Sequence, residues 1–362
     1  MEVDSLFENK TVAKAILKEI FSLSEKLREP IKIMEVCGTH TQVIAKFGIR
    51  KILPKNIKLI SGPGCPVCVT PSYYIEQAIT LAKMGYFIAT FGDLLKVPSN
   101  KKSLEKEISN GAKVNVVYSP SDALKIAEQN KSETVIFLAV GFETTIPSIC
   151  ATILEAEKKK IGNFKILSSH KIIPPALEVL AKDPLLKIDG FICPGHVSVI
   201  IGAKSYDFLP KKFNRGAVIA GFTPIDILLS VKELVRQKVM NEPENVNNYK
   251  RVVKEKGNTF ALNLINQLFE TVDVEWRGFG VIPSSGLKLK KRWEEFDAEK
   301  IEVSFEKPEE PNNCRCGDVL KGIISPSECP LMGKVCSPEN PVGACMVSSE
   351  GSCSAYYKYE RN

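Results

Sequence analysis

Thiol groups are the most concentrated chemistry in this chain of 362 residues. It has eleven cysteines, and six of them lie near the C-terminus: Cys314, Cys316, Cys329, Cys336, Cys345 and Cys353. Such a cluster forms either disulfides or a metal centre. The N-terminal residues are charged every few positions, unlike a secretory signal, and no window is apolar enough to span a membrane. We therefore expect a cytoplasmic protein whose clustered thiols bind metal.

The spacing of these thiols favours iron over zinc. After the initial C-x-C pair, the successive cysteines are separated by twelve, six, eight and seven residues. Zinc ribbons use paired C-x-x-C knuckles, whereas the thiolates around a [4Fe-4S] cluster tolerate irregular spacing. The tail has few large apolar residues, so we expect it to fold only around its metal centre. Six thiols exceed the four ligands of one cluster, which leaves two spare.

Two further thiol motifs lie in the N-terminal part of the chain. In MEVCGTHTQ, Cys37 and His40 are three residues apart. Such a pair can bind a metal or form an activated thiolate, and the alternative is a buried cysteine beside a surface histidine. In SGPGCPVCVTP, the C-x-x-C spacing of Cys65 and Cys68 suits a redox disulfide or half of a metal site. We favour the redox pair because it needs no further ligand.

Polar residues follow similar apolar runs in the middle of the chain. Glu143 and Thr144 lie in AVGFETTIP, where a carboxylate is either a helix cap, the simpler explanation, or a general base or ligand. His196 follows Cys193 in FICPGHVS, and His170 lies in SSHKIIPP. With His40, these are the three histidines of the chain, and each follows an apolar run. Their placement predicts one shared cleft.

The apolar runs before these motifs have strand length and alternate with helical stretches. This pattern predicts buried parallel strands in an α/β fold. The first runs are IKIMEV, IKLIS, YFIAT and VNVVYS, and about a hundred residues later four similar runs follow in the same order: TVIFLAVG, FKILSSH, GFICPGHVS and AVIAGF. We therefore expect two similar parallel-sheet α/β domains, over residues 1–120 and 121–238, with a helix at the N-terminus that Pro30 ends.

Residues 239–362 have a looser pattern and are predicted to form a smaller domain, mostly helix and loop, that carries the cysteine-rich tail. Within it, residues 241–272 are expected to be helical with one polar side, and residues 276–289 to be loop and short strand. Cys150 lies in an apolar helical stretch and is expected in the core.

The charge pattern does not indicate a nucleic-acid partner. The net charge is +7, and the lysines are spread along the chain without interleaved aromatic residues. Such lysines are typical of solvated surfaces. We expect neither nucleic-acid nor membrane binding.

The motifs CGTH, GPGCPVCVTP, GFETT and PGHVS, with the tail ending MVSSEGSCSAYY, together resemble the HypD family of hydrogenase maturation factors over nearly the whole chain. The resemblance implies two similar α/β domains and a third domain with a [4Fe-4S] cluster. It implies a scaffold with redox capacity that assembles the Fe(CN)2CO unit of [NiFe]-hydrogenase, rather than a free-standing turnover enzyme. It also implies a HypC-like chaperone and a HypE-like cyanide donor as partners of a chain that is monomeric when alone.

The same resemblance implies a role for each motif residue. Cys37 would hold, together with a HypC cysteine, a mononuclear iron that carries cyanide and carbon monoxide, with His40 beside it. Cys65 and Cys68 would be the dithiol or disulfide pair, and the same cleft would be lined by Glu143, Thr144 and His196. The implied cluster ligands are Cys316, Cys329, Cys336 and Cys353, with Cys314 and Cys345 as alternates.

Two other functions are compatible with the same residues. One is a disulfide reductase resembling ferredoxin:thioredoxin reductase, which also combines a cluster with a dithiol. The other is a binding protein whose tail holds structural zinc. A reductase would work without Cys37, and a zinc protein would be colourless.

Overall fold

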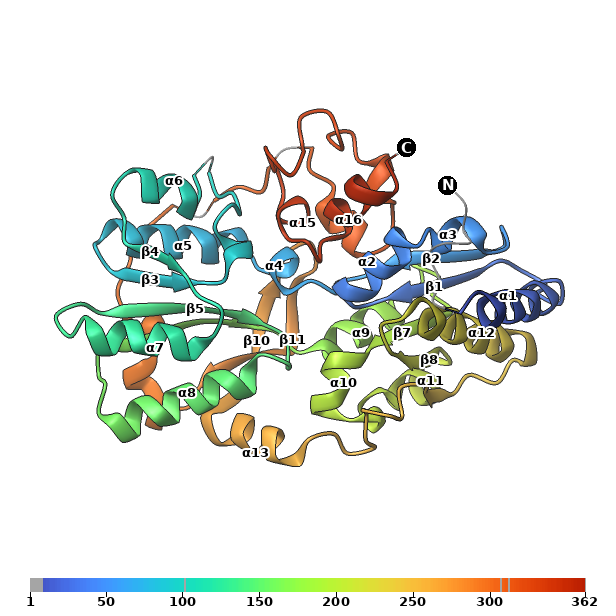
Figure 1. Cartoon of the computed structure of the whole chain (residues 1–362), viewed down its shortest axis with the longest axis horizontal. Coiled ribbons are helices and arrows are strands. Elements are labelled where there is room, and N and C mark those ends of the chain that lie inside the picture. Colours follow the sequence, from blue (N-terminus) through green and yellow to red (C-terminus); the bar gives the residue numbers. More distant parts are fainter. Residues whose placement is uncertain (1–8, 101, 307, 312, 362) are drawn as a thin grey trace.

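The computed structural model describes residues 9–361 except 101, 307 and 312. It contains two parallel sheets, each covered by helices, and a cysteine-rich tail that lies above their junction in Figure 1. We call each sheet with its helices a lobe. The predicted α/β class with a small cysteine-rich part is therefore confirmed.

Lobe A is built on a sheet of five parallel strands in the order β2-β1-β7-β8-β9. These strands are β2 (Ile57–Ser61), β1 (Ile31–Glu35), β7 (Gly190–Pro194), β8 (Gly216–Ala220) and β9 (Asn245–Asn247). Every residue of β7 and β8 is buried, because helices cover both faces of the sheet.

Lobe B is built on four parallel strands in the order β4-β3-β5-β6. They are β4 (Val114–Val116), β3 (Phe87–Thr90), β5 (Val135–Gly141) and β6 (Phe164–His170). All seven residues of β5 are buried, as the continuous apolar run predicts.

The strand orders reveal how the repeated runs are arranged. If β1, β2, β7 and β8 are matched to β5, β6, β3 and β4, the order β2-β1-β7-β8 becomes β6-β5-β3-β4, which is the sheet of lobe B. Each sheet therefore takes strands from both predicted segments, and neither sheet corresponds to residues 1–120 or 121–238. The chain crosses from lobe A to lobe B through α4 (Pro66–Val69) and α5 (Ser72–Lys83) and returns through α9 (Ile173–Lys182). Local sequence similarity marks equivalent strands but does not encode the sheet that each strand joins.

The remaining helices cover the sheets or belong to the tail. They are α1 (Lys10–Ser24), α2 (Gly38–Lys46), α3 (Ile49–Ile52), α6 (Leu104–Ser109), α7 (Pro120–Gln129), α8 (Ile146–Lys159), α10 (Gly195–Ile201), α11 (Phe208–Phe213), α12 (Pro224–Met240), α13 (Thr259–Leu268), α14 (Cys316–Leu320), α15 (Ala344–Val347) and α16 (Ser352–Tyr359). Short 3-10 helices are η2 (Gly92–Leu94), η3 (Ala203–Tyr206), η4 (Lys291–Phe296), η5 (Ala298–Lys300) and η6 (Pro326–Glu328). The predicted N-terminal helix is α1, which ends before Pro30. Cys150 is fully buried in α8, as predicted.

The prediction of a continuous helix over residues 241–272 is wrong. This stretch contains β9, the ten-residue helix α13 and the start of β10 (Phe269–Trp276). Strand β10 forms an antiparallel hairpin with β11 (Gly280–Leu289). Apolar and polar residues alternate from Val272 to Trp276. The β-branched Thr271, Val272 and Val274 favour a strand once a partner is present.

The hairpin attaches to lobe B where the chain leaves its sheet. Lys171 bridges to Gly286 of β11, and the Ile172 amide donates a hydrogen bond to the Ser285 carbonyl oxygen at 2.9 Å. Across the described residues, no helix has the length and apolarity needed to cross a membrane.

Candidate metal and redox site

The loops after β1 and β2 meet at the carboxyl end of the sheet in lobe A. Cys37 follows β1, Cys65 follows β2, and the two strands are parallel neighbours. The Gly38 amide donates to the Gly64 carbonyl oxygen at 3.0 Å. A Cβ atom at Gly64 would lie 2.4 Å from the Cys37 nitrogen, so only glycine allows this approach. Adjacent parallel strands thus bring the CGTH and GPGC motifs together, at the end of the sheet where ligands bind in open α/β folds.

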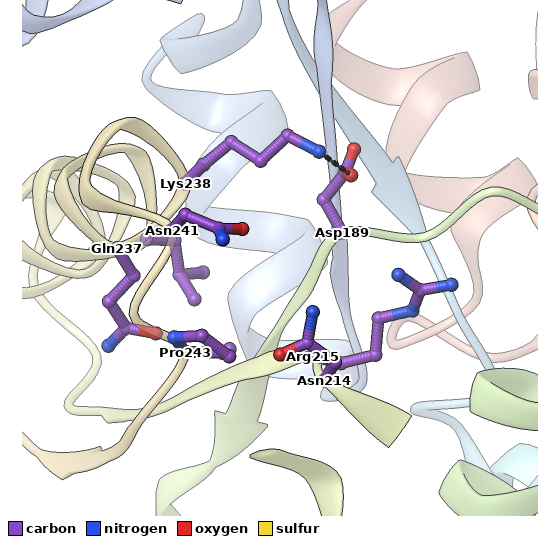
Figure 2. A pocket seen from close by; sticks show the side chains of 9 residues that line it. Asp189, Asn214, Arg215, Gln237, Lys238, Asn241 and Pro243 are labelled. Atoms are coloured by element: carbon purple, nitrogen blue, oxygen red, sulfur yellow. Dashed lines mark hydrogen bonds and ion pairs between the residues drawn. The ribbon is translucent and has the colours of Figure 1, made fainter.

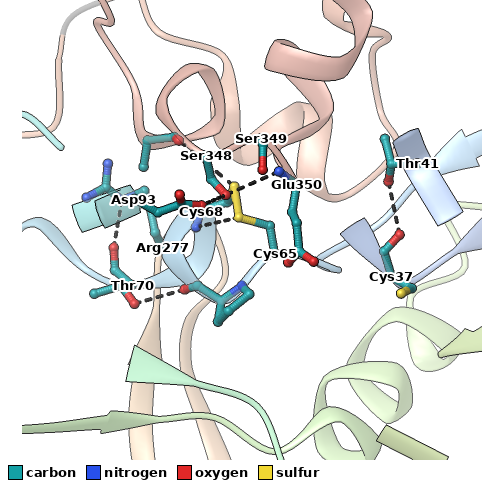
Figure 3. Close-up of a disulfide and its surroundings, with 12 residues drawn as sticks. Cys37, Thr41, Cys65, Cys68, Thr70, Asp93, Arg277, Ser348, Ser349 and Glu350 are labelled. Atoms are coloured by element: carbon teal, nitrogen blue, oxygen red, sulfur yellow. Dashed lines mark hydrogen bonds between the residues drawn. A yellow bond between two sulfur atoms is a disulfide. The ribbon is translucent and has the colours of Figure 1, made fainter. Parts of the chain in front are cut away.

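Cys65 and Cys68 form a disulfide at the start of α4 (Figure 3). Their Cα atoms are 5.3 Å apart. Pro66 occupies the first turn of α4, and the Cys65 sulfur accepts from the Cys68 amide at 3.2 Å. Only 2% of Cys65 and 0% of Cys68 is exposed. The disulfide is therefore positioned by a short helix at the junction of the lobes and is closed off from solvent.

Cys37 is almost completely buried, and burial raises the pKa of its thiol to about 12. The carboxyl group of Glu35, two residues earlier, is fully buried as well, and burial raises its pKa to about 7. Glu35 accepts hydrogen bonds from the Thr41 hydroxyl at 2.7 Å and from the Cys37 amide at 3.4 Å, with Arg50 at 3.8 Å. A bare Cys37 is thus a neutral thiol, and a thiolate there needs a cation such as a metal ion.

His40 is 0% exposed, so the alternative of a surface histidine is wrong. Its Nε2 lies 3.0 Å from the Gly221 carbonyl oxygen and must donate to it, since a carbonyl only accepts. Its Nδ1 is buried and has no partner among the described residues. Burial lowers the pKa of His40 to about 4, so the ring is neutral and Nδ1 carries a lone pair.

His196 lies close to His40, but His170 does not join them. The His40 and His196 rings pack against the same Phe222 ring, with centroids 5.1 and 3.9 Å from it. His170 is the last residue of β6 in lobe B, where its Nδ1 bonds to the Ser168 hydroxyl and its ring meets Phe269 edge-on. The strand-end pattern therefore places two of the three histidines together.

Glu143 caps a helix, but not the one that follows it in the chain. Its Oε1 accepts from the Ile173 amide, at the start of α9, at 2.9 Å. Its Oε2 is buried and has no partner among the described residues, and burial raises the pKa of this carboxyl to about 7. Thr144, next to it, is exposed.

Tyr206 is a fully buried tyrosine of lobe A whose phenol responds to charge on the site residues. Burial raises the pKa of Tyr206, and negative charge on Cys193, Glu143 or Cys37 would raise it further. The phenol oxygen accepts a hydrogen bond from the Ser198 hydroxyl at 3.1 Å. Sequence reasoning missed Tyr206, and it also missed Glu35. A signal for Glu35 existed, because it is an acidic residue within the otherwise apolar run IKIMEV.

All six tail cysteines line one small cavity, together with Leu331, Met332, Gly343 and Met346. The Cys316 thiol interacts with the thiols of Cys314 and Cys345, and the Cys345 thiol also interacts with that of Cys353. Cys336 lies near Cys314 and Cys329. Among the described residues, no three His, Cys, Asp or Glu side chains are arranged to hold a single metal ion. A [4Fe-4S] cluster makes a different demand, because each iron takes one thiolate and the ligands surround a larger group. Six thiols with apolar neighbours are a donor set of the kind that such a cluster uses.

The cysteine cavity and the disulfide are neighbours. Cys345 lies on α15, and the carbonyl oxygen of the preceding Ala344 is 4.0 Å from the Cys68 sulfur. Residues 348–351, between Cys345 and Cys353, lie beside the disulfide and the Cys37 loop in Figure 3. The three thiol sites recognised in the sequence are therefore contiguous in space.

A polar pocket at the opposite end of lobe A is separate from these sites. Figure 2 shows Asp189 paired with Lys238 at 2.7 Å, with Asn214, Arg215 and Asn241 nearby. Helices α11 and α12 end here with Asn214 and Asn241 in the left-handed conformation, at φ of 54° and 55°. Cations at helix C-termini complement the helix dipole, which explains this pocket structurally.

Comparison with known proteins identifies the family. The HypD family model, described as the hydrogenase formation hypA family, matches residues 11–360. A putative hydrogenase expression/formation protein of Methanocaldococcus jannaschii is 43% identical, covering 98% of both chains. The hydrogenase maturation factor HypD of Escherichia coli is 42% identical over 95% of this chain and 96% of its own, and that of Rhodobacter capsulatus is 40% identical over 99% and 98%. Because the family model and these relatives match nearly the whole chain, the chain belongs to the HypD family of hydrogenase maturation factors.

Proposed function

We propose that this protein holds an iron ion at Cys37 while the ion acquires two cyanide ligands and one carbon monoxide, forming the Fe(CN)2CO unit of [NiFe]-hydrogenase. The iron is cargo. A HypC-like chaperone would supply a second thiolate, and a HypE-like protein would supply cyanide. The observation that carries this proposal is the contact between the Cys37 loop and the loop of the Cys65–Cys68 disulfide, which itself adjoins the six-cysteine cavity.

The surroundings of Cys37 suit a thiolate ligand of low-spin iron. Thiolates are soft donors that keep a metal electron-rich. Cys37 is buried, so it gives up its proton readily only when a metal ion takes the proton's place. The neutral His40 adds a lone pair at Nδ1. The His196 ring packs against Phe222, the same aromatic ring that His40 contacts. Glu143 and Thr144 complete the polar groups that we assign to the cleft.

The tail cavity would hold a [4Fe-4S] cluster through Cys316, Cys329, Cys336 and Cys353, with Cys314 and Cys345, which line the same cavity, as alternates. When bound, such a cluster supplies single electrons. The Cys65–Cys68 pair stores two, since reducing its disulfide to two thiols takes up two electrons and two protons. We propose that this pair delivers reducing equivalents next to the iron.

The alternative is a disulfide reductase resembling ferredoxin:thioredoxin reductase. The placement of a C-x-x-C disulfide beside the cysteine cavity favours it. Its burial argues against it, because a partner thiolate has to reach one of the two sulfur atoms directly. A reductase would also turn over without Cys37.

The proposal is tested on protein purified anaerobically with its HypC-like partner. We expect about four irons and four sulfides per chain for the cluster, in addition to the cargo iron, together with visible absorption. Infrared spectra of the complex should contain cyanide and carbonyl bands. These bands should vanish in Cys37→Ala and persist in Cys150→Ala, a matched control in the core of lobe B. Zinc in place of iron, or bands that survive in Cys37→Ala, would overturn the proposal.

A further inference from the structure

We propose that residues 348–351 form a strap that ties lobe A to lobe B across the Cys65–Cys68 disulfide and prevents thiols in solution from reducing it. The strap would thereby determine which reductants the disulfide accepts. The inference rests on the proposed function only in giving this disulfide a redox role.

One end of the strap is bound to lobe B. The Ser348 hydroxyl donates a hydrogen bond to the Asp93 carboxylate at 2.6 Å. Asp93 belongs to η2, directly after β3, whereas Ser348 is almost completely buried in the tail. A short hydrogen bond to a charged acceptor is among the stronger side-chain contacts in proteins. Figure 3 shows this pair next to the disulfide.

The other end of the strap lies on lobe A, beside Cys37. Glu350 accepts a hydrogen bond from the Thr39 hydroxyl at 3.4 Å, and the Gln42 side-chain amide donates to the Ser349 carbonyl oxygen. A Cβ atom at Gly38 would lie 2.3 Å from the Glu350 Cβ, so the strap rests directly on the backbone of the CGTH motif. The Thr39, Gln42 and Gly38 contacts all lie on α2.

The strap is also held at its base by the tail. Cys345 precedes it and Cys353 follows it, and both line the cysteine cavity. A Cβ atom at Gly351 would lie 2.1 Å from the Cys345 carbonyl oxygen, so the strap closes tightly against α15. Helix α15 also contacts Cys68 through Ala344, and the strap lies beside the disulfide in Figure 3, so we infer that the two cover it together.

This cover decides whether an external thiol can react. A thiolate of dithiothreitol must attack one sulfur of the disulfide and release the other as a thiolate; its second thiol then resolves the mixed disulfide. Cys65 and Cys68 end as two thiols, and one dithiothreitol becomes a cyclic disulfide. Since Cys65 is 2% exposed and Cys68 is 0% exposed, the first attack requires the packing around them to open, and we assign this opening to the strap.

The test measures how fast dithiothreitol reduces the disulfide in the full chain, prepared anaerobically with its metal centre. Reduced Cys65 and Cys68 are trapped by alkylation and counted by mass spectrometry. We expect Ser348→Ala and Asp93→Ala each to raise the rate about tenfold, as when about 1.4 kcal/mol of stabilisation is lost. The double variant should match the single ones, because both changes break the same contact.

Ser119→Ala is the matched control, because it removes a similar serine–aspartate hydrogen bond, to Asp122 at 2.7 Å, on α7. Its rate should equal that of the wild type. Two results would overturn the inference: equal rates in the strap variants and the control, or acceleration in Ser348→Ala but not in Asp93→Ala, which would rule out the bridge between lobes. The assay needs no cargo iron and no partner, so it can fail while the proposed function stands, and the reverse also holds.

Discussion

At the scale of a single residue, burial changes the pKa of the Glu143 carboxyl group. Its carboxyl group lies at the end of β5, accepts one hydrogen bond from the start of α9, and keeps a second oxygen without a partner among the described residues. Burial raises its pKa to about 7, from an ordinary value of 4.5. Near neutral pH such a group can therefore hold or release a proton inside the protein.

This shift predicts a pH-dependent stability. A carboxyl group whose pKa is raised by folding binds its proton more tightly in the folded state. The stability that it contributes is complete below pH 4.5 and is lost as the pH rises through about 7. Glu143→Gln keeps the acceptor for Ile173 and removes the charge. We expect the variant to gain, relative to the wild type, on the order of 2 kcal/mol between pH 5 and pH 8.

The measurement is thermal unfolding of both proteins at pH 5 and pH 8. Glu128→Gln, an exposed glutamate on α7, should differ from the wild type equally at both pH values. The same equality in Glu143→Gln would mean that the carboxyl group does not carry a raised pKa.

At the scale of elements, close contacts between turns build the site. The turn after β1 and the turn after β2 approach until only a glycine fits at position 64, and the strap rests on Gly38 of α2 in the same way. A parallel pair of strands brings the two turns to one edge, and the absent side chains allow the final approach. The relative position of Cys37 and Cys65 therefore depends on backbone contact.

Gly64→Ala tests this dependence. The added Cβ would meet the Cys37 backbone at 2.4 Å, so one turn must shift. We expect a loss of about 1–3 kcal/mol of stability, measured by thermal unfolding, and loss of the cyanide and carbonyl bands in the complex. Gly162→Ala, where no atom lies within 4 Å of the added Cβ, should leave both unchanged. Retained bands in Gly64→Ala would show that this contact does not position Cys37.

At the scale of the whole molecule, the two lobes are interlocked. Strands β1 and β2 need β7 and β8 to complete their sheet, and β3 and β4 need β5 and β6. The hairpin β10–β11 and the tail then contact the segments through which the chain passes between the lobes. Sequential folding of one complete domain after another is excluded by this connectivity.

The interlocking predicts how fragments behave. Residues 1–120 alone contain two of the five strands of one sheet and two of the four strands of the other, so the apolar edges of β1 and β3 would lie open to solvent. We expect this fragment to aggregate or to unfold without a cooperative transition, as followed by circular dichroism during heating, whereas the full chain unfolds cooperatively. A sharp transition in the fragment would contradict the role of the shared sheets.

Much of the site could be predicted because its residues lie in local patterns. Apolar runs followed by Gly, Pro, Cys and His predict buried strands that end in tight turns, and parallel strands gather such turns at one edge. These patterns mark the turns that carry Cys37, Cys65 and Cys68, and the structure brings the two turns into contact. The sequence also predicted the parallel α/β class and the common environment of the tail cysteines.

Only the tertiary structure decided which strands share a sheet, that His170 lies apart from His40 and His196, and that Glu143 caps α9. It also placed the strap between Asp93 and Thr39, residues of different lobes. The physical reason is the same in each case. Apolar periodicity and turn residues report the burial and direction of a segment, whereas the choice of a partner far along the chain depends on packing that no local pattern encodes.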